Sequence, residues 1–227
     1  VQIRQAIDKS LIDLFAAERA ARRIHDELAR FPPDKLLDAV CDALKEAQSE
    51  KDEDEATLRL VRLASLLGEL SGPRAVDALI DVLASDYPEA RHAAGEEIGQ
   101  LAYERFKEVA QGVERALKRL PVGSPALPEL PYILAEVPEP GVMKLIDQFL
   151  NHKDADAVAA AIESLVEIGD PAAAKLIARL TEDQRMVEIS DDGTDMTSEV
   201  SIGELAAEAL HLLESPASDA SPGGATS

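Results

Sequence analysis

A short motif recurs along the chain, in which Leu or Ile is followed by Gly and a helix that opens with Pro often comes next. Its copies are Leu67-Gly68 ahead of Gly72-Pro73, Ile98-Gly99, the degraded Leu134-Ala135 ahead of Pro138, and Ile168-Gly169 ahead of Asp170-Pro171. The intervals are close to one unit of two helices, which is typical of repeat proteins whose units bury their apolar faces against one another. We therefore predict an all-α solenoid, a right-handed superhelix of about five helix pairs.

The spacing of apolar residues places the helices of these pairs. They are expected at 33–48 and 58–70, at 75–83 and 90–101, at 106–120, at 142–149 and 158–165, and at 171–180 and 202–210. Because Pro125, Pro128 and Pro131 each lack a backbone donor, we expect a loop over 121–132 and then a short helix over 132–137. A β-hairpin insertion is predicted at about 185–200, since Asp192-Gly193 supplies the positive φ of a tight turn.

Two regions flank the predicted repeat domain, which we place at 32–214. Residues 1–31 form a predicted helix with an apolar stripe, made of Ile3, Ile7, Leu11, Leu14, Ala21, Ile24 and Leu28. The stripe needs a partner surface, and two interpretations stay open: a capping helix laid on the first repeat, or a dimerisation helix that makes a homodimer. Residues 215–227, composed largely of Ser, Pro, Gly and Ala, are predicted to be a disordered tail.

The second and fifth pairs carry a recognisable repeat sequence. The matching segments are Gly72-Pro73-Arg74-Ala75-Val76, Ala90-Arg91-His92-Ala93-Ala94 with Ile98-Gly99, Gly169-Asp170-Pro171-Ala172, and residues 200–210. Through them the chain resembles the HEAT-like repeats of the phycobilin-lyase class over residues 32–214. The resemblance implies the fold and leaves the function open. The Arg that recurs in this family near the start of the second helix is matched by Arg91 and is missing from pairs four and five.

The chain is strongly acidic, with 44 Asp and Glu against 23 Lys and Arg and a formal net charge of −21. Nucleic-acid binding rests on basic contacts to phosphates, so this balance argues against a nucleic-acid partner. The sequence also holds no apolar stretch of the length that crosses a bilayer, which argues against a membrane partner. We expect a bacterial-type cytoplasmic protein.

Signatures of catalysis and metal binding are missing from the sequence. Di-iron hydroxylases of related architecture repeat His-Glu pairs, whereas here His25, His92, His152 and His211 are followed by other residues. The acidic residues around Asp191 do not have the spacing of a calcium loop. We therefore expect a protein that is not an enzyme, with no catalytic, cofactor-binding or metal site. The alternative is a lyase for a bilin or another cofactor, with Tyr87, Tyr103, Phe106 and Tyr132 lining an apolar pocket.

Acidic residues gather at the turns between the two helices of a pair. The groups are Asp52, Glu53, Asp54 and Glu55; Asp86 and Glu89; Asp154 and Asp156; and Glu182, Asp183, Asp191, Asp192 and Asp195. Carboxylates at the start of a helix cap free N–H groups and complement the dipole, which explains one or two per turn. The excess predicts an acidic edge that attracts a partner with a basic surface.

The expected function is therefore a scaffold or adaptor that binds another protein through its concave face or its acidic edge. In such repeats the second helices line the concave face. The candidate contacts on that face are Arg59, Arg62, Arg91, His92, Glu96 and Glu163. A further alternative is an acidic inhibitor of a basic, nucleic-acid-binding enzyme.

Overall fold

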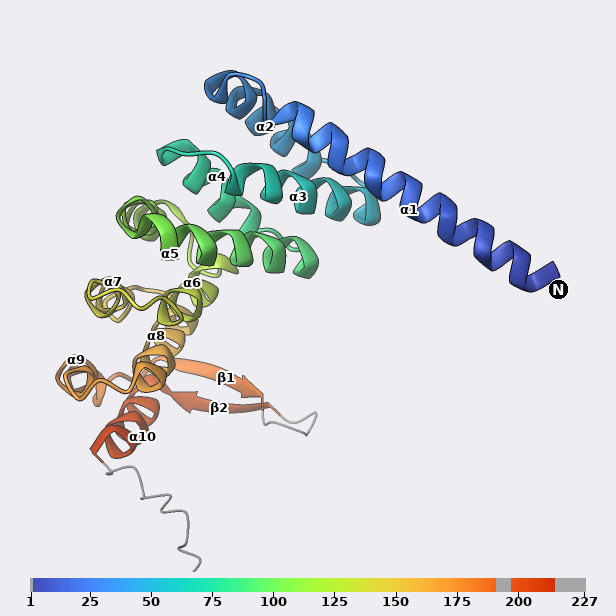
Figure 1. Ribbon diagram of the computed structural model, residues 1–227. Helices are drawn as coiled ribbons and strands as arrows, with labels where there is room; N and C mark the ends of the chain where they lie inside the picture. The colour runs from blue at the N-terminus through green and yellow to red at the C-terminus, as the bar shows by residue number, and fades with distance from the viewer. Residues whose placement is uncertain (1, 191–196, 215–227) are drawn as a thin grey trace, which may run out of the picture. The chain divides into compact units, whose positions relative to one another are not determined.

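The computed structural model describes residues 2–190 and 197–214 (Figure 1). Within them the chain is helical apart from one two-stranded sheet, which confirms the predicted all-α repeat fold with a short β-hairpin. The chain divides into two compact units, Val1–Glu97 and Ile98–Ser227, so residues 1–31 belong to the same unit as residues 32–97. The turn Asp192-Gly193, the predicted site residues Asp191, Asp192 and Asp195, and the predicted tail 215–227 lie outside the described residues.

The first unit contains four helices and the beginning of a fifth. They are α1 (Gln2–Leu28), α2 (Pro33–Gln48), α3 (Glu53–Gly68), α4 (Pro73–Leu83) and the first turns of α5 (Pro88–Arg119). Proline stands at the start of α2 and α4, where its missing N–H would have no partner in the helix anyway. Helices α2, α3 and α4 contact one another, and their shared core is built from Leu, Ile and Ala.

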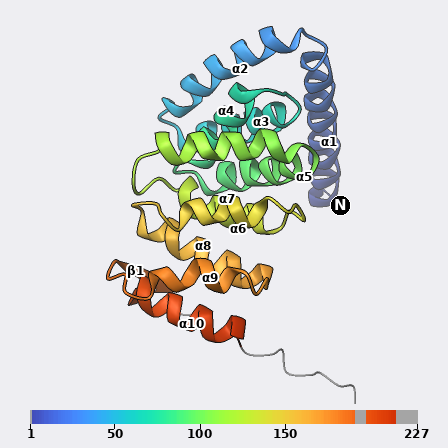
Figure 2. The same cartoon turned by 90° about the vertical axis from the view of Figure 1, so that its left-hand side faces the viewer.

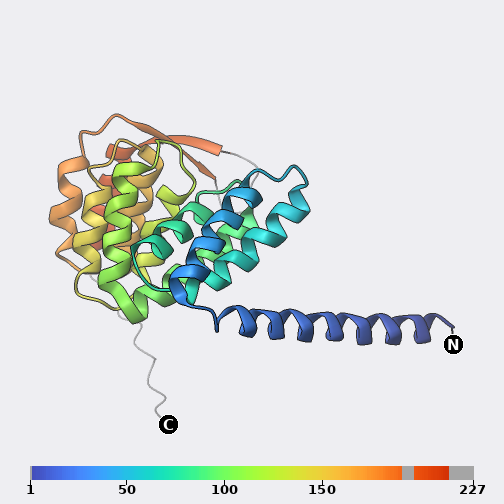
Figure 3. The ribbon, with the colours of Figure 1, turned by 90° about the horizontal axis from the view of Figure 1, so that it is seen from above.

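Helix α1 lies where the sequence predicts it, but its apolar stripe is not covered. Every residue from 2 to 17 is exposed, including Ile3 at 78% and Leu14 at 60% of the side-chain surface. Only the last turns touch the rest of the unit, and the remainder of α1 runs away from α2–α4 (Figure 3). Of the two interpretations left open, a capping helix laid on the first repeat accounts for the last turns of α1 but not for residues 2–17.

Two contacts explain why α1 extends beyond the beginning of α3. Glu18 meets Arg62 and His25 meets Glu69, so α1 and α3 run parallel with one sequence offset of 44 residues. At that offset Glu53, the first residue of α3, corresponds to Lys9. The residues of α1 before Lys9 have no part of α3 beside them.

The second unit continues from within α5. It contains α6 (Ala126–Ala135), α7 (Val142–Phe149), α8 (Ala155–Ile168), α9 (Ala173–Ile177) with the 3₁₀ turn Ala178–Leu180, β1 (Met186–Ser190), β2 (Thr197–Ser201) and α10 (Ile202–Glu214). Helix α8 is its centre, because it contacts α6, α7, α10 and β1 (Figure 2). The buried ring of Phe149 and the side chains of Leu127, Leu130 and Ile146 form its core.

The proline-rich segment of the third pair differs from the prediction. Instead of a loop over 121–132, helix α6 begins at Ala126 and includes both Pro128 and Pro131. Pro128 lies in the first turn, where the N–H groups have no acceptor inside the helix, so its missing donor removes no bond. Pro131 lies inside the helix and is buried. The predicted break between residues 101 and 106 is present as a non-helical Arg105 (φ −137°, ψ 50°) within α5.

The predicted hairpin is present as the antiparallel pair β1–β2, in which Met186 pairs with Ser201 and Ser190 pairs with Thr197. Arg185, just before β1, donates to the His152 carbonyl at 2.7 Å and pairs with Asp183. Gly203 lies shortly after β2 at a position that requires glycine, because a Cβ there would lie 2.7 Å from the Thr181 carbonyl oxygen. These contacts hold the residues just before β1 and just after β2 against the rest of the second unit.

Candidate functional site: an acidic groove on the first unit

A groove of about 600 Å³ lies between the outer face of α3 and the start of α5. Its lining consists of Glu53, Asp54, Thr57, Leu58, Val61, Arg62, Tyr87, Pro88 and Glu89. Three of these residues are acidic, one is basic, and four present apolar or aromatic surface. The groove therefore combines an apolar floor with a predominantly acidic rim.

The sequence of α3 builds this face through two separate sets of apolar residues. Leu60, Leu63 and Leu67 point into the core of the unit. Leu58 and Val61 recur at helical spacing on another face, and Leu58 is 55% exposed. Helix α3 thus has two sets of apolar residues, and the one that carries Leu58 is not covered within the unit.

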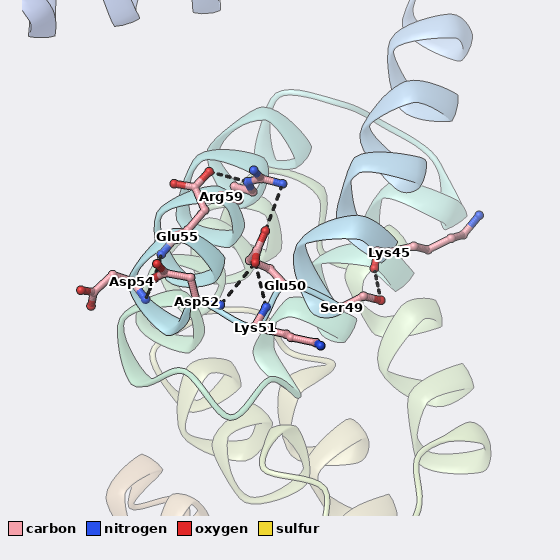
Figure 4. Close-up of polar contacts among 8 residues, drawn as sticks. All are labelled: Lys45, Ser49, Glu50, Lys51, Asp52, Asp54, Glu55 and Arg59. Carbon is pink, nitrogen blue, oxygen red and sulfur yellow. Dashed lines mark hydrogen bonds and ion pairs between the residues drawn. The ribbon is translucent and has the colours of Figure 1, made fainter.

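Some of the carboxylates in the acidic turn ahead of α3 bind backbone N–H groups at the start of the helix (Figure 4). The Asp52 carboxylate caps α3 by accepting from the backbone N–H groups of Asp54 at 3.1 Å and Glu55 at 3.2 Å. Glu50, which the sequence argument did not select, accepts from the N–H groups of Lys51 and Asp52. These bonds, together with Arg59, lower the pKa of Glu50.

Arg59 neutralises much of the remaining charge of this turn. Its guanidinium donates to Glu55 at 2.6 Å and lies 3.8 Å from Glu50. Within the described part of the chain, Glu53, Asp54, Asp86 and Glu89 have no ion-pair partner. In Figure 4 the Asp54 side chain points away from the cluster that surrounds Arg59. Three of these four carboxylates, Glu53, Asp54 and Glu89, line the groove.

The other predicted contacts of the first unit have structural partners. Arg91 donates to the Ser85 carbonyl at 3.2 Å and so helps to hold the turn before α5. Arg62 lies 3.6 Å from Glu18 of α1, and His92 lies 3.6 Å from Glu96 one turn along α5. Of the residues named from the sequence in this unit, the structure brings together five in one groove: Glu53, Asp54, Arg62, Tyr87 and Glu89.

In the second unit, Asp154 does not belong to an exposed acidic surface. It is only 2% exposed, caps α8 by accepting from Ala157 N–H, and also accepts from Gly123 N–H at 2.6 Å. The prediction that Asp154 contacts a partner is corrected, because its side chain is buried. Asp156 is largely exposed, and the partial desolvation of its carboxyl, followed by the nearby Asp154 and Glu188, raises its pKa.

A second groove of about 410 Å³ lies among α8, β1 and α10. It is lined by Ile162, Glu163, Val166, Glu167, Ile189, Leu205, Glu208, Ala209 and Leu212. The Tyr132 hydroxyl donates to the Glu163 carboxylate, and burial together with this bond raises the pKa of Tyr132. Phe106 packs against Gly141, and Tyr103 is exposed, so neither takes part in this groove.

The described residues, 2–190 and 197–214, hold neither a metal-binding cluster nor a membrane-spanning helix. They contain no group of three or more His, Cys, Asp or Glu side chains placed to hold a metal ion. Among the helices of this same part of the chain, none combines the length and the apolar character that crossing a membrane requires.

Comparisons with known proteins give no family for the chain. No family model matches it, and no curated protein matches it. Two engineered proteins of known structure are 20% and 18% identical to it, with TM-scores of 0.34 and 0.32; the matches cover 86% and 87% of this chain and 89% and 92% of theirs. A computationally designed armadillo repeat protein for modular peptide recognition is 12% identical with a TM-score of 0.33, covering 86% of this chain and 92% of its own. At such similarities, function has to be argued from the residues of this chain.

Proposed function

We propose that this protein is a non-enzymatic binding scaffold of the HEAT-like type, which holds a basic and partly apolar segment of another protein in the groove of the first unit. The observation that carries the proposal is the pairing of unpartnered carboxylates, Glu53, Asp54 and Glu89, with an exposed apolar floor. Carboxylates that only stabilise a solvated helix start would explain the charges at this position. They would not explain the exposed apolar residues beside them.

The chemistry of the groove suits Lys and Arg side chains set among apolar ones. Their methylene stems bury apolar surface on Leu58 and Val61 while the charged ends stay with the rim carboxylates. The ring of Tyr87 offers a face to a cation. Exposed ion pairs contribute little affinity, so the floor supplies most of the binding energy and the rim supplies the rate and the selectivity.

A direct test titrates the full chain with two helical peptides of equal apolar content, one carrying Lys and the other Glu at its polar positions. Fluorescence anisotropy across a salt series gives the affinity for each peptide. We expect binding of the Lys peptide alone, weakening as salt screens the rim. The variant Glu53→Gln/Asp54→Asn/Glu89→Gln should lose most of this binding.

The matched control removes three carboxylates of the same unit that do not line the groove, in Asp13→Asn/Asp26→Asn/Glu46→Gln. It makes the same change in net charge and should bind the Lys peptide nearly as well as the wild type. Equal losses in both variants would show that net charge alone attracts the peptide. That outcome, or equal binding of both peptides, would exclude the groove as the site.

The lyase alternative has less support from the geometry. Its proposed aromatic lining is not brought together, because Tyr132 is bonded to Glu163 and Phe106 packs over Gly141, whereas Tyr87 lines the acidic groove of the first unit. An absorbance shift when a bilin is added to the chain would favour it nevertheless. The inhibitor alternative uses the same acidic rim and is distinguished by an enzyme assay with a basic nucleic-acid-binding target.

A further inference from the structure

The first four turns of α1 expose a continuous apolar face, which we call the N-terminal stripe: Ile3, Ile7, Leu11, Leu14 and Phe15. These side chains are between 43% and 78% exposed. Their spacing of three and four residues places them on one side of the helix. Helix α1 carries seven of the fourteen large apolar side chains exposed in the described residues, so this surface is unusual for the chain.

The stripe continues a face that is already used for packing. Farther along the helix the same face carries Glu18, Ala21 and His25, which are partly covered where α1 meets α3. Toward the N-terminus the two helices separate, since Leu14 and its counterpart at the offset of 44, Leu58, are both more than half exposed. The free part of α1 is thus a packing surface without a partner inside its own unit.

The net charge of α1 indicates what kind of partner its N-terminal stripe takes. The basic residues of α1 are Arg4, Lys9, Arg19, Arg22 and Arg23, and its acidic residues are Asp8, Asp13, Glu18, Asp26 and Glu27. Five charges of each sign give α1 a net charge of zero, so the whole net charge of −21 belongs to the rest of the chain. A basic partner gains nothing by choosing α1. Two copies of the chain repel each other elsewhere and can approach without repulsion here.

We propose that two copies of this chain associate through their N-terminal stripes. From the exposed fractions, each stripe offers roughly 500 Å² and the pair buries roughly 1,000 Å², the lower limit of a specific interface. The dimer is therefore weak and depends on concentration. It also supplies the tertiary packing that the free turns of α1 lack, since most of the stability of a helix in a protein comes from packing of its apolar face.

Sedimentation equilibrium of the full chain tests the proposal. We expect the mass to rise with concentration from 24.3 kDa toward twice that value. Leu11→Glu should weaken the dimer by roughly 100-fold or more, because it buries an unpaired carboxylate in each copy. Ala16→Glu introduces the same charge at a side chain that is also exposed but lies about 140° farther around the helix, on the side away from the stripe, and it should leave the dimer intact.

The salt dependence separates this interface from the groove. Salt screens the repulsion between two acidic chains, so it should strengthen the dimer while it weakens binding of the Lys peptide. Far-ultraviolet circular dichroism establishes that both variants keep their helices. A wild-type chain that stays at 24.3 kDa, a mass beyond two chains, or equal effects of the two substitutions would each overturn the proposal. None of these results depends on whether the groove binds a peptide.

Discussion

At the scale of single residues, the glycines that define the repeated motif serve different purposes. Gly169 ends α8 in the left-handed conformation, with φ of 68°. A Cβ at Gly68 would collide with the Glu97 carboxylate, whereas a Cβ at Gly99 would meet Ile133 at an ordinary 3.7 Å. The sequence reveals the recurrence of these glycines. It does not reveal the reason for each, because the reasons lie in backbone angles and in neighbours distant along the chain.

Two substitutions to alanine should therefore have opposite effects on stability. Gly169→Ala forces a Cβ into a left-handed backbone and should lower the free energy of unfolding by about 1 kcal/mol. Gly99→Ala adds a methyl group inside a helix with room for it and should raise that free energy by about 0.5–1 kcal/mol. Urea unfolding of both variants measures the difference. Destabilisation by both would mean that α5 needs close contact at Gly99.

Glu97 gives a pH-dependent prediction. Burial, followed by the nearby Glu69 and Glu96, raises the pKa of its carboxyl above the ordinary 4.5, and His25 opposes this shift. The unfolded chain therefore releases the proton first, and ionising Glu97 costs stability as pH rises from 4.5 through the raised pKa. Glu97→Gln should raise the melting temperature near neutral pH and have little effect below pH 4.5.

The neighbouring exposed carboxyl provides the control for this measurement. Glu96→Gln should change the melting temperature little at either pH, because the Glu96 side chain stays in solvent. A stabilisation by Glu97→Gln that persists unchanged in acid would show that the carboxyl charge is not its cause.

At the scale of helices and strands, the positions where these elements start and end follow from local sequence. Which of their faces another element covers does not. Helices α2, α4 and α8 lie close to their predicted bounds, α3 begins five residues before its predicted start because the Asp52 cap starts it at Glu53, and the β1–β2 strands were expected from the Asp-Gly turn between them. Helix α6 was missed because Pro128 lies in its first turn, where a missing N–H removes no hydrogen bond, and because the helix accommodates Pro131 in its interior. The exposure of α1 was missed because it depends on where α3 begins.

The groove shows the same division. Glu53, Asp54 and Glu89 were selected from the sequence because acidic residues gather at the turns, and Arg62 as a candidate contact on the concave face. The floor of the groove was not, because Leu58 and Val61 resemble core residues at helical spacing. The available signal was that α3 carries more apolar residues than one buried stripe needs.

The two aspartate caps should differ in their effect on stability. Asp52→Ala removes an exposed cap and should cost about 1 kcal/mol. Asp154→Ala removes a buried carboxylate that also accepts from Gly123 N–H, so it should cost about 2–3 kcal/mol. Thermal or urea unfolding compares them. Equal losses would mean that the link to Gly123 contributes nothing.

At the scale of the whole molecule, the charge of −21 acts on stability as well as on partners. Repulsion among carboxylates opposes the compact state, and salt screens it. We expect the melting temperature to rise with sodium chloride and to level off once the screening length falls below about 10 Å. Differential scanning fluorimetry over a salt series measures this, with sucrose as an uncharged control. A melting temperature that falls with salt would mean that attractive ion pairs outweigh the repulsion.

The exposed beginning of α1 has a practical use. Residues 2–17 take no part in the core, so they tolerate replacement provided that the new sequence stays helical. Dyes, tethers or foreign peptide epitopes can be installed there without rebuilding the repeats. Lengthening or shortening the segment by whole heptads would tune how strongly engineered versions pair.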